Sequence, residues 1–544
     1  MFDLACCRDT GRQYIALNKP MLILILLLLT PLRLSYLLVS PAPRTKAVSA
    51  SIAFVVGFVL LILAGTLPTF INKKLEKGVL EATILTQKTK DNNDAIYRTF
   101  VDPEDKDSTP VYTYFYTLTC TNTEDVVTNG AAPAFQEKGP YVYRKLTRRE
   151  NVAFLDNGGY RYVRFVPQTS YRFDADQTPK DLDPLHDEIT VPNIDFFTDY
   201  MLKNSGLMPA EQFFAKWGNK TDEERLFVVD TVHDYLSKLH LLDSDTPNTK
   251  YDEWYTGEGN PGMTGILKTW KEQGISTNML GLQTWQNSQA NILTGTDGTR
   301  FNQFQPECSK ARVTAFVTEA GRTVSLSCER EYTVNGITLY QFGISPEAML
   351  PADKNPENAK YNMKYQGVFD VSSLNLISVA LTKPHFLDAP DLLARTQGLT
   401  PDRALHDIVI GVEPISGVVM DARKSLQVNF MTMGPFKVDG HDDVEFLAKV
   451  PADTPLPPVW VSERGRIGSS SAKKFRGSVY AAQSASKYII SVGCSIGSIL
   501  VFFSFAWFVY DRNKLLNSVT SFPDYPVAQP ADRDQHLEIN YHRI

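Results

Sequence analysis

The 544-residue sequence has little of several features that would define its class. It contains only 6 cysteines, so disulfide bonds cannot be its main scaffold. Its 55 lysines and arginines nearly balance 61 aspartates and glutamates, so no strongly basic surface for nucleic acid is expected. The mean hydropathy of −0.20 is too polar for a transporter with many membrane spans. With 43% hydrophobic and 21% charged residues, a largely disordered chain is excluded as well.

Motifs that would indicate an enzyme are also scarce. The sequence has no HExxH and no CxxC. Gly257–Gly262 matches GxGxxG, but it follows no predicted strand and contains Pro261, which favours a turn-rich loop over a dinucleotide site. Ser484–Lys487 matches SxxK, but it lies beside a long apolar run, where a lysine anchor is expected. We therefore predict no catalytic site, no cofactor and no metal ion.

Two long runs without charge stand out against this background. Residues 47–71 and 488–510 contain no Asp, Glu, Lys or Arg, and each is long enough for a membrane-spanning helix, which needs ~20 apolar residues. Tyr488 and Tyr510 lie at the ends of the second run, where aromatic rings favour the headgroup layer. We predict two membrane helices with residues 72–487 between them as one extramembrane body. The alternative for the second run is a buried core helix.

The N-terminal region, residues 1–46, contains a shorter apolar run. Met21–Leu29 is strongly apolar, but Pro31 and Arg33 interrupt it. Residues 21–39 are interpreted as an extra interfacial segment, a signal-peptide core or an upstream extension of the gene model, and we favour the last. Cys6 and Cys7 are candidates for palmitoylation, although they lie far from the first predicted span.

The extramembrane body has strand-like and helical regions. Val111–Thr119 is rich in β-branched and aromatic residues, which is typical of a strand. Asp156–Gly159 and Asn335-Gly336 lie between such runs and predict hairpin turns. We predict mainly antiparallel strands in two blocks, at about 100–190 and 300–465, with helices between the blocks.

The region between the two blocks has the signals of several helices. Asn193–Lys203 is predicted as one helix, and a second short helix follows Pro209. Thr221–Glu224 forms a capping box. We expect it to open a helix whose apolar face comprises Leu226, Val229, Val232, Leu236 and Leu239.

Three histidines near this region are candidates for sensing acid pH, because the ordinary pKa of histidine is ~6.5. His233 and His240 are seven residues apart and would share one face of the predicted helix, and His186 lies upstream. The alternative interpretation is that they are solvated histidines beside acidic residues.

Several short motifs resemble those of a known family. They are Gly139–Arg144 (GPYVYR), Asn291–Asp297 (NILTGTD), Pro384–Pro390 (PHFLDAP), Glu413–Gly417 (EPISG), Leu426–Asn429 (LQVN) and Pro458–Ile467 (PVWVSERGRI). In this order they resemble the class B scavenger receptor family, which includes the fatty-acid translocase and the lysosomal integral membrane protein type 2. The resemblance covers roughly residues 50–510.

The resemblance implies an α+β membrane protein with both tails cytosolic. Its large lumenal or extracellular domain would be an irregular antiparallel β-barrel with an apolar tunnel and a helical cap at about 192–242. The tunnel would pass fatty acids or sterols to the membrane, and the cap could bind a protein ligand such as a lysosomal hydrolase. A sorting receptor for such a hydrolase is the first alternative. A membrane-tethered hydrolase and a structural or adhesion role are the others.

The sequence also departs from this family. Many members have several disulfides and glycans in the large domain, whereas this one has Cys120, Cys308 and Cys328 and one glycosylation acceptor, Asn219. Cys308 falls in the family's usual cysteine-containing strand, and we expect it to pair with Cys328. An unpaired structural cysteine is the alternative for any of the three.

The predicted cytosolic tail, residues 511–544, contains two candidate sorting signals for clathrin adaptors. Asp511, Leu515 and Leu516 fit the acidic dileucine pattern, although they lie close to the predicted membrane span. Tyr541 and Ile544 fit the pattern of a tyrosine followed by a bulky apolar residue three positions later. Together they favour a lysosomal or endosomal membrane, with the plasma membrane as the alternative.

Overall fold

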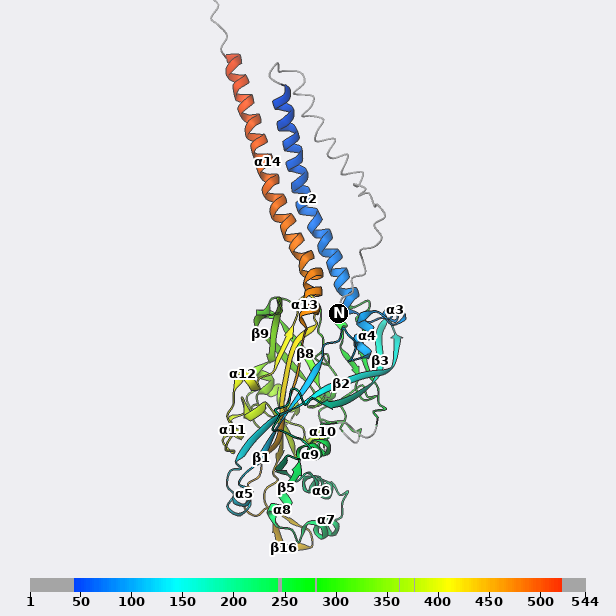
Figure 1. Cartoon of the computed structure of the whole chain (residues 1–544), viewed down its shortest axis with the longest axis vertical. Coiled ribbons are helices and arrows are strands. Elements are labelled where there is room, and N and C mark those ends of the chain that lie inside the picture. Colours follow the sequence, from blue (N-terminus) through cyan, green and yellow to red (C-terminus); the bar gives the residue numbers. More distant parts are fainter. Residues whose placement is uncertain (1–43, 243–246, 279–280, 362, 376, 521–544) are drawn as a thin grey trace, which may run out of the picture. The chain divides into compact units, whose positions relative to one another are not determined.

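The computed structural model describes residues 44–242, 247–278, 281–361, 363–375 and 377–520 (Figure 1). The described chain divides into two compact units. One comprises residues 75–481, and residues 44–74 and 482–520 belong to the other. The run at 21–39 lies outside the described ranges. So do four residues for which the sequence predicted a role: Cys6, Cys7, Tyr541 and Ile544.

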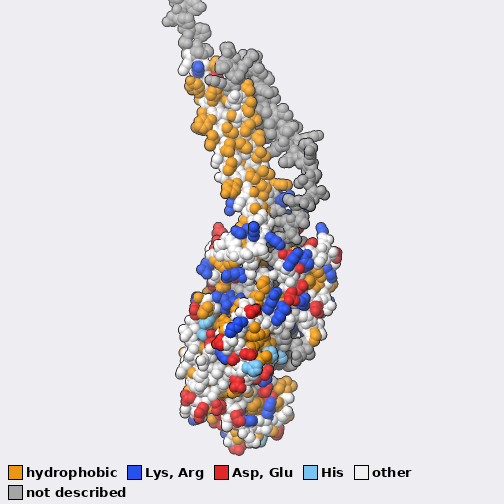
Figure 2. Space-filling model, in the orientation of Figure 1, with side chains coloured by type: hydrophobic (Ala, Val, Ile, Leu, Met, Phe, Trp, Pro, Cys, Tyr) orange, Lys and Arg blue, Asp and Glu red, His pale blue; other side chains and the backbone are white. Residues whose placement is uncertain are grey.

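Two long helices match the two predicted membrane spans. They are α2 (Arg44–Thr83) and α14 (Ala481–Thr520), and both are long and apolar enough to cross a membrane. Figure 2 shows them covered with apolar side chains. They approach closely at small residues: a Cβ atom on Gly57 would lie 2.8 Å from the carbonyl oxygen of Gly497, and one on Gly493 would lie 2.8 Å from Cβ of Ala64. Glycines therefore let the two helices pack, as in other membrane helix pairs.

A 13-stranded antiparallel sheet dominates the unit of residues 75–481. Along its main path the strand order is β7-β6-β3-β2-β1-β17-β14-β13-β10-β9-β8, and β12 and β11 branch from β14. The strands are β1 (Val111–Cys120), β2 (Phe135–Asn157), β3 (Tyr160–Phe173), β6 (Asp252–Tyr255), β7 (Leu267–Thr269), β8 (Arg312–Val317), β9 (Arg322–Val334), β10 (Ile337–Ile344), β11 (Phe369–Asp370), β12 (Val379–Thr382), β13 (Val409–Val412), β14 (Val419–Met431) and β17 (Pro455–Arg466).

A short segment between the two end strands brings this sheet close to a closed barrel. The amide of Leu267, in β7, donates to the carbonyl oxygen of Gly295 at 2.9 Å. The amide of Phe316, in β8, donates to the carbonyl oxygen of Thr296 at 2.7 Å. The predicted antiparallel barrel is therefore confirmed.

Both predicted hairpin turns are present. Asn335 and Gly336 join β9 to β10 with φ values of 49° and 75°, and Gly158 and Gly159 join β2 to β3 with φ values of 63° and 86°. Glycine adopts this left-handed backbone without a steric penalty, which is why these short motifs specify the turns.

The predicted cap contains both helices and strands. Its elements are β4 (Glu188–Pro192), α6 (Ile194–Asn204), α7 (Ala210–Trp217), α8 (Asp222–Leu226), β5 (Phe227–Thr231) and α9 (Val232–Lys238). The capping box of Thr221 and Glu224 is present, but the single long helix predicted after it is wrong, because α8 ends at Leu226. The next five residues pair with β4. The β-branched Val228 and Val229 favour a strand, but the strand forms only by pairing with β4, which lies far away in the sequence.

The remaining elements lie in loops around the sheet. The helices are α3 (Gln87–Asp91), α4 (Ala95–Val101), α5 (Thr123–Asn129), α10 (Ser372–Asn375), α11 (Pro390–Leu393), α12 (Arg403–His406) and α13 (Ser469–Phe475), and β15 (Phe436–Val438) pairs with β16 (His441–Phe446). The 3₁₀ turns are η1 (Pro261–Met263), η2 (Ser288–Asn291), η3 (Cys308–Lys310), η4 (Pro346–Met349), η5 (Pro356–Tyr361) and η6 (Pro384–Phe386), and η7 (Arg476–Tyr480) is a π-helical turn.

The predicted disulfide between Cys308 and Cys328 is confirmed. Cys308 lies in the 3₁₀ turn η3 before β8, however, and not in a strand as the resemblance implied. Cys120 is a buried free thiol, and burial raises its pKa to about 11. A thiol in this state is a poor nucleophile and serves as an apolar packing group.

Candidate binding sites on the two faces of the barrel

The contacts of Lys424 identify which face of the sheet is the inner one. Lys424 lies in β14, and its Nζ is 2.5 Å from Oε1 of Glu319, in the turn between β8 and β9. Along the sheet, β13, β10 and β9 separate these two positions. The contact therefore crosses the barrel, and the face of Lys424 points inward. Because successive side chains alternate between faces, the neighbouring Arg423 faces outward.

The inner face carries two linked ion pairs. Lys145 Nζ lies 2.5 Å from Oε1 of Glu463, and Lys424 contacts Glu319. The side chains of Lys145 and Glu463 retain 23% and 24% of their exposure. Burial alone would raise the pKa of Glu319, but Lys424 outweighs it and holds that pKa at about 2. Lys145 lowers the pKa of Glu463 against the same effect of burial. Each pair therefore favours the ionised form of its carboxylate.

A row of aromatic side chains follows the same face across three strands. Phe115, in β1, lies 5.5 Å from Tyr143 and 6.3 Å from Tyr171 between ring centroids, and Tyr143 lies 5.3 Å from Phe173. Phe115 is 1% exposed and packs with β4 and α9 of the cap, whereas Phe173 is 39% exposed. The row thus connects the cap-covered interior to the surface.

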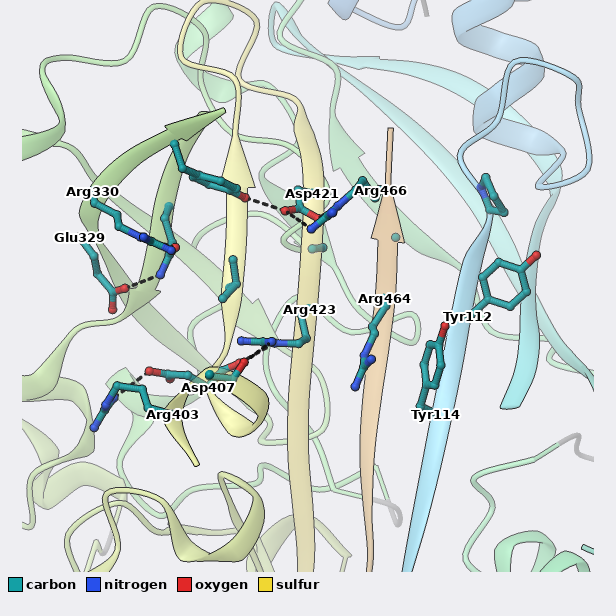
Figure 3. Close-up of a pocket in the computed structure, with 17 residues that line it drawn as sticks. Tyr112, Tyr114, Glu329, Arg330, Arg403, Asp407, Asp421, Arg423, Arg464 and Arg466 are labelled. Carbon is teal, nitrogen blue, oxygen red and sulfur yellow. Dashed lines mark hydrogen bonds and ion pairs between the residues drawn. The ribbon is translucent and has the colours of Figure 1, made fainter. Parts of the chain in front are cut away.

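The outer face has a pocket of about 840 Å³ (Figure 3). Strands β1, β9, β10, β13, β14 and β17, together with α12, supply its walls. The charged lining residues are Arg330, Arg403, Arg423, Arg464, Arg466, Glu329, Asp407 and Asp421. Five arginines therefore face three carboxylates, and the pocket has an excess of positive charge.

The three carboxylates of this pocket already have partners. Asp421 contacts Arg466 at 2.9 Å and accepts a hydrogen bond from the hydroxyl of Tyr332, also at 2.9 Å. Asp407 contacts Lys383 at 2.6 Å and Arg403 at 2.7 Å. The third, Glu329, accepts a hydrogen bond from the Gln341 side chain at 2.8 Å.

Arg423 and Arg464 are held in place by neutral groups. Arg423 donates to the carbonyl oxygens of Asp407 and Ala404 at 3.1 Å and 2.6 Å. Arg464 donates from Nε to Oγ of Ser462 at 3.0 Å, and its guanidinium lies 4.3 Å from the ring centre of Tyr114. Burial, and then Arg464, lower the pKa of Arg423. Both arginines are therefore preorganised beside one another.

A buried histidine pair lies close to this pocket, and sequence reasoning missed it. The rings of His385 and His406 are 4.4 Å apart between centroids. Oε2 of Glu137 lies 2.6 Å from Nε2 of His385 and accepts a hydrogen bond from the indole of Trp460 at 2.7 Å. Burial, and then His385, lower the pKa of His406 to about 4. His385 lies within the PHFLDAP motif, which was the one available signal.

The three predicted histidine sensors do not form one cluster. α9 ends at Lys238, and His240 follows with a φ of 54°, so His233 and His240 do not share a helix face and that prediction is wrong. The amide of His233 donates to the carbonyl oxygen of Pro184 at 2.8 Å, next to the segment of His186. The exposed His186 contacts Asp183 at 2.8 Å.

The other predicted residues lie on helices and turns. Asn219 is exposed in the turn between α7 and α8, where a glycan would be accessible. Asp511, Leu515 and Leu516 lie in the last part of α14. Across the described ranges, no three His, Cys, Asp or Glu residues are grouped so that they could hold a metal ion.

Comparison with known proteins identifies the family. The model of the CD36 family matches residues 50–508, from within α2 to within α14. The chain belongs to the CD36 family. Lysosome membrane protein 2 of Mus musculus is 25% identical over 400 residues, which cover 69% of this chain and 80% of the relative. The protein of the same name from Homo sapiens is 26% identical over 351 residues, covering 60% and 70%.

A second group of relatives carries a receptor name. Scavenger receptor class B member 1 of Bos taurus is 24% identical over 395 residues, which cover 67% of this chain and 72% of the relative. The predicted resemblance to the class B scavenger receptors is thus confirmed. With two candidate membrane helices in the matched region, the chain is a membrane receptor of this family.

Proposed function

We propose that this receptor binds fatty acids or sterols inside the barrel and passes them to the membrane, without catalysing a reaction. The aromatic row from Phe115 to Phe173 carries the proposal, because its rings contact one another from the residue covered by the cap to the exposed Phe173. Burial contributes ~0.8 kcal/mol per CH₂ group, so a long acyl chain would bind there firmly without a covalent step.

The rest of the inner face supports the same proposal. Leu426, Val428 and Val461 are half-buried on this face and present apolar surface beside the two ion pairs. Lys145 and Lys424 are paired with Glu463 and Glu319 and keep 23% and 31% of their side-chain exposure. A fatty acid or sterol would contact the apolar residues of this face and the aromatic row, while the two ion pairs stay intact.

Equilibrium binding of tritiated cholesterol and tritiated oleate to the full chain in detergent tests the proposal. We expect saturable binding, and Phe173→Asp should weaken it several-fold because a charge would interrupt the apolar row. Tyr160→Asp is the matched control, since Tyr160 is an exposed aromatic residue at the other end of the same strand. Absence of saturable binding by the unmodified protein would refute the lipid proposal, and equal losses in both variants would refute the proposed path.

We further propose that the receptor resides in lysosomal or endosomal membranes with both tails cytosolic, as a glycoprotein. The names of the first group of relatives, the exposed acceptor Asn219 and the disulfide support this location, because disulfides persist in oxidising compartments. Clathrin adaptors would then recognise the signal at Tyr541 and Ile544. Imaging of a tagged Tyr541→Ala variant should show more protein at the cell surface. Undiminished lysosomal delivery would show that this signal is dispensable.

A sorting receptor for a lysosomal hydrolase is the second candidate function. The cap exposes large apolar side chains: Leu185, Leu207 and Val229 are 58%, 65% and 60% exposed. Such residues could contact a protein ligand, although single exposed apolar residues are common on protein surfaces. A Leu207→Asp, Val229→Asp variant should then lower the lysosomal content of a soluble hydrolase, and unchanged content would refute this candidate.

A further inference from the structure

The pairing of β14 with β17 contains one mismatch of charge. Three register positions place a charged residue opposite another: Asp421 opposes Arg466, Lys424 opposes Glu463, and Arg423 opposes Arg464. The first two combinations are attractive. The third puts two guanidinium groups on directly opposed positions of the outer face, where like charges destabilise a sheet.

The positive charge continues along the same row of the sheet. Tyr112 opposes Arg464 on one side and Arg144 on the other, and Arg144 in turn opposes Arg172. The row from Arg423 to Arg172 crosses five neighbouring strands, which makes it about 19 Å long at ~4.8 Å per strand. Tyr112 lines both the large pocket and a second hollow of about 280 Å³ that also contains Arg144 and Arg172.

The members of this row are incompletely paired within the described part of the chain. Nε of Arg144 is buried and has no hydrogen-bond partner there. Neither Arg423 nor Arg464 contacts a carboxylate in the described ranges, although Arg172 pairs with Glu104 at 2.9 Å. Asp174 and Asp176 lie at the Arg172 end, so the excess of positive charge is greatest between Arg423 and Arg144.

We propose that this row on the outer face binds a sulfated saccharide chain. Guanidinium groups match the planar array of oxygens on sulfate esters, and arginine is weakly hydrated, so such contacts form readily on a protein surface. The rings of Tyr112 and Tyr114 supply flat surfaces for sugar rings between the charges. The other uncharged lining residues are Tyr332, Pro110, Ala404, Val409, Ala422, Gly465 and Gln341. An extended polyanion therefore matches the row of guanidinium groups from Arg423 to Arg172.

This inference does not depend on lipid binding, because it concerns the opposite face of the sheet. Binding of the full chain in detergent to immobilised heparin oligosaccharide is the test. We expect saturable binding that Arg464→Gln weakens by roughly tenfold to a hundredfold, as for loss of a charge-assisted contact. Arg161→Gln, which removes an equal charge from an exposed residue paired with Glu258, should retain binding within about twofold.

Several outcomes would overturn the proposal. They are absence of binding by the unmodified chain, equal losses in the Arg464 and Arg161 variants, and undiminished binding to fully desulfated heparin. Stronger, Arg464-dependent binding to phosphatidylserine vesicles would replace the saccharide by a lipid surface. Thermal unfolding of the Arg464→Gln variant shows whether a loss of heparin binding is due to misfolding. We expect a midpoint no lower than that of the unmodified protein, because the substitution removes a repulsion.

Discussion

Charged residues are arranged differently on the two faces of the β14–β17 pair: opposite charges face one another on the inner face, whereas one pair of like charges does so on the outer face. On the inner face Lys424 opposes Glu463, and Lys145 and Glu319 complete two ion pairs. On the outer face, at the adjacent pair of positions, Arg423 and Arg464 oppose one another. A charge taken from water into a barrel must be neutralised, because its desolvation costs several kcal/mol, whereas solvent screens a repulsion at the surface. Inner charges are thus committed to partners, and outer ones remain available to a ligand.

Removing one charge from the inner face should lower the stability of the protein more than any other change proposed here. Glu463→Gln leaves Lys145 without its 2.5 Å partner while preserving the size of the side chain. Because breaking a partly buried pair leaves an uncompensated charge, we expect the free energy of unfolding to fall by about 2 kcal/mol. Chemical denaturation of the full chain in detergent measures this change.

Arg464→Gln is the matched control for this prediction, because the two residues are neighbours on β17 and lie on opposite faces. Its free energy of unfolding should stay the same or rise slightly. If the two variants lose equal stability, the distinction between committed and available charges is wrong.

Acid pH should sharpen the comparison, because the folded chain resists the addition of a positive charge to His406 beside the outer arginines. The pKa of His406 lies at about 4, first because of burial and then because of His385, and Arg423 lowers it as well, whereas Glu137 and Asp402 raise it. In the unfolded chain histidine titrates near 6.5, so the unfolded state takes up the proton first. Stability is therefore full above pH ~6.5, falls as the pH drops toward 4, and changes little below. At pH 5 the expected loss is about 2 kcal/mol.

Unfolding midpoints between pH 7 and pH 4 test this prediction in the unmodified chain and in two variants. His406→Gln should flatten the profile, because the titrating group is gone. His186→Gln changes an exposed histidine of the cap and should leave the profile as it is. A flat profile in the unmodified chain would show that the pKa of His406 is the same in the folded and in the unfolded state.

Local signals in the sequence predicted much of the fold. Asn335-Gly336 predicted its hairpin because the backbone of that turn depends on those two residues alone. The capping box at Thr221 likewise predicted where α8 begins. The length of the helix could not be predicted, since Phe227–Thr231 becomes a strand only through pairing with β4, about 40 residues earlier in the chain.

The candidate sites depended almost wholly on such distant pairings. Arg423 and Arg464 are 41 positions apart, and neither carries a motif of its own; only the register of β14 against β17 makes them neighbours. His385 and His406 are joined by the packing of two loops against Trp460. The disulfide was predictable because two neighbouring strands could bring Cys308 and Cys328 together, although Cys308 lies in the turn η3 just before β8.

The smallest expected effect on stability comes from replacing the two opposed arginines of the outer face by a pair of opposite charges. Arg464→Glu would place a carboxylate opposite Arg423, as Asp421 stands opposite Arg466 at the neighbouring outer position. Gain of an attractive pair and loss of a repulsive one should raise the free energy of unfolding by about 0.5–1 kcal/mol, reduced by loss of the contact with Tyr114. The same variant should abolish heparin binding, and 0.5 M NaCl should reduce the stability gain because both residues are only partly buried. A variant that is less stable at low salt would mean that the chain retains two arginines here for folding, with Arg464 stabilising β17 through Tyr114 and Ser462.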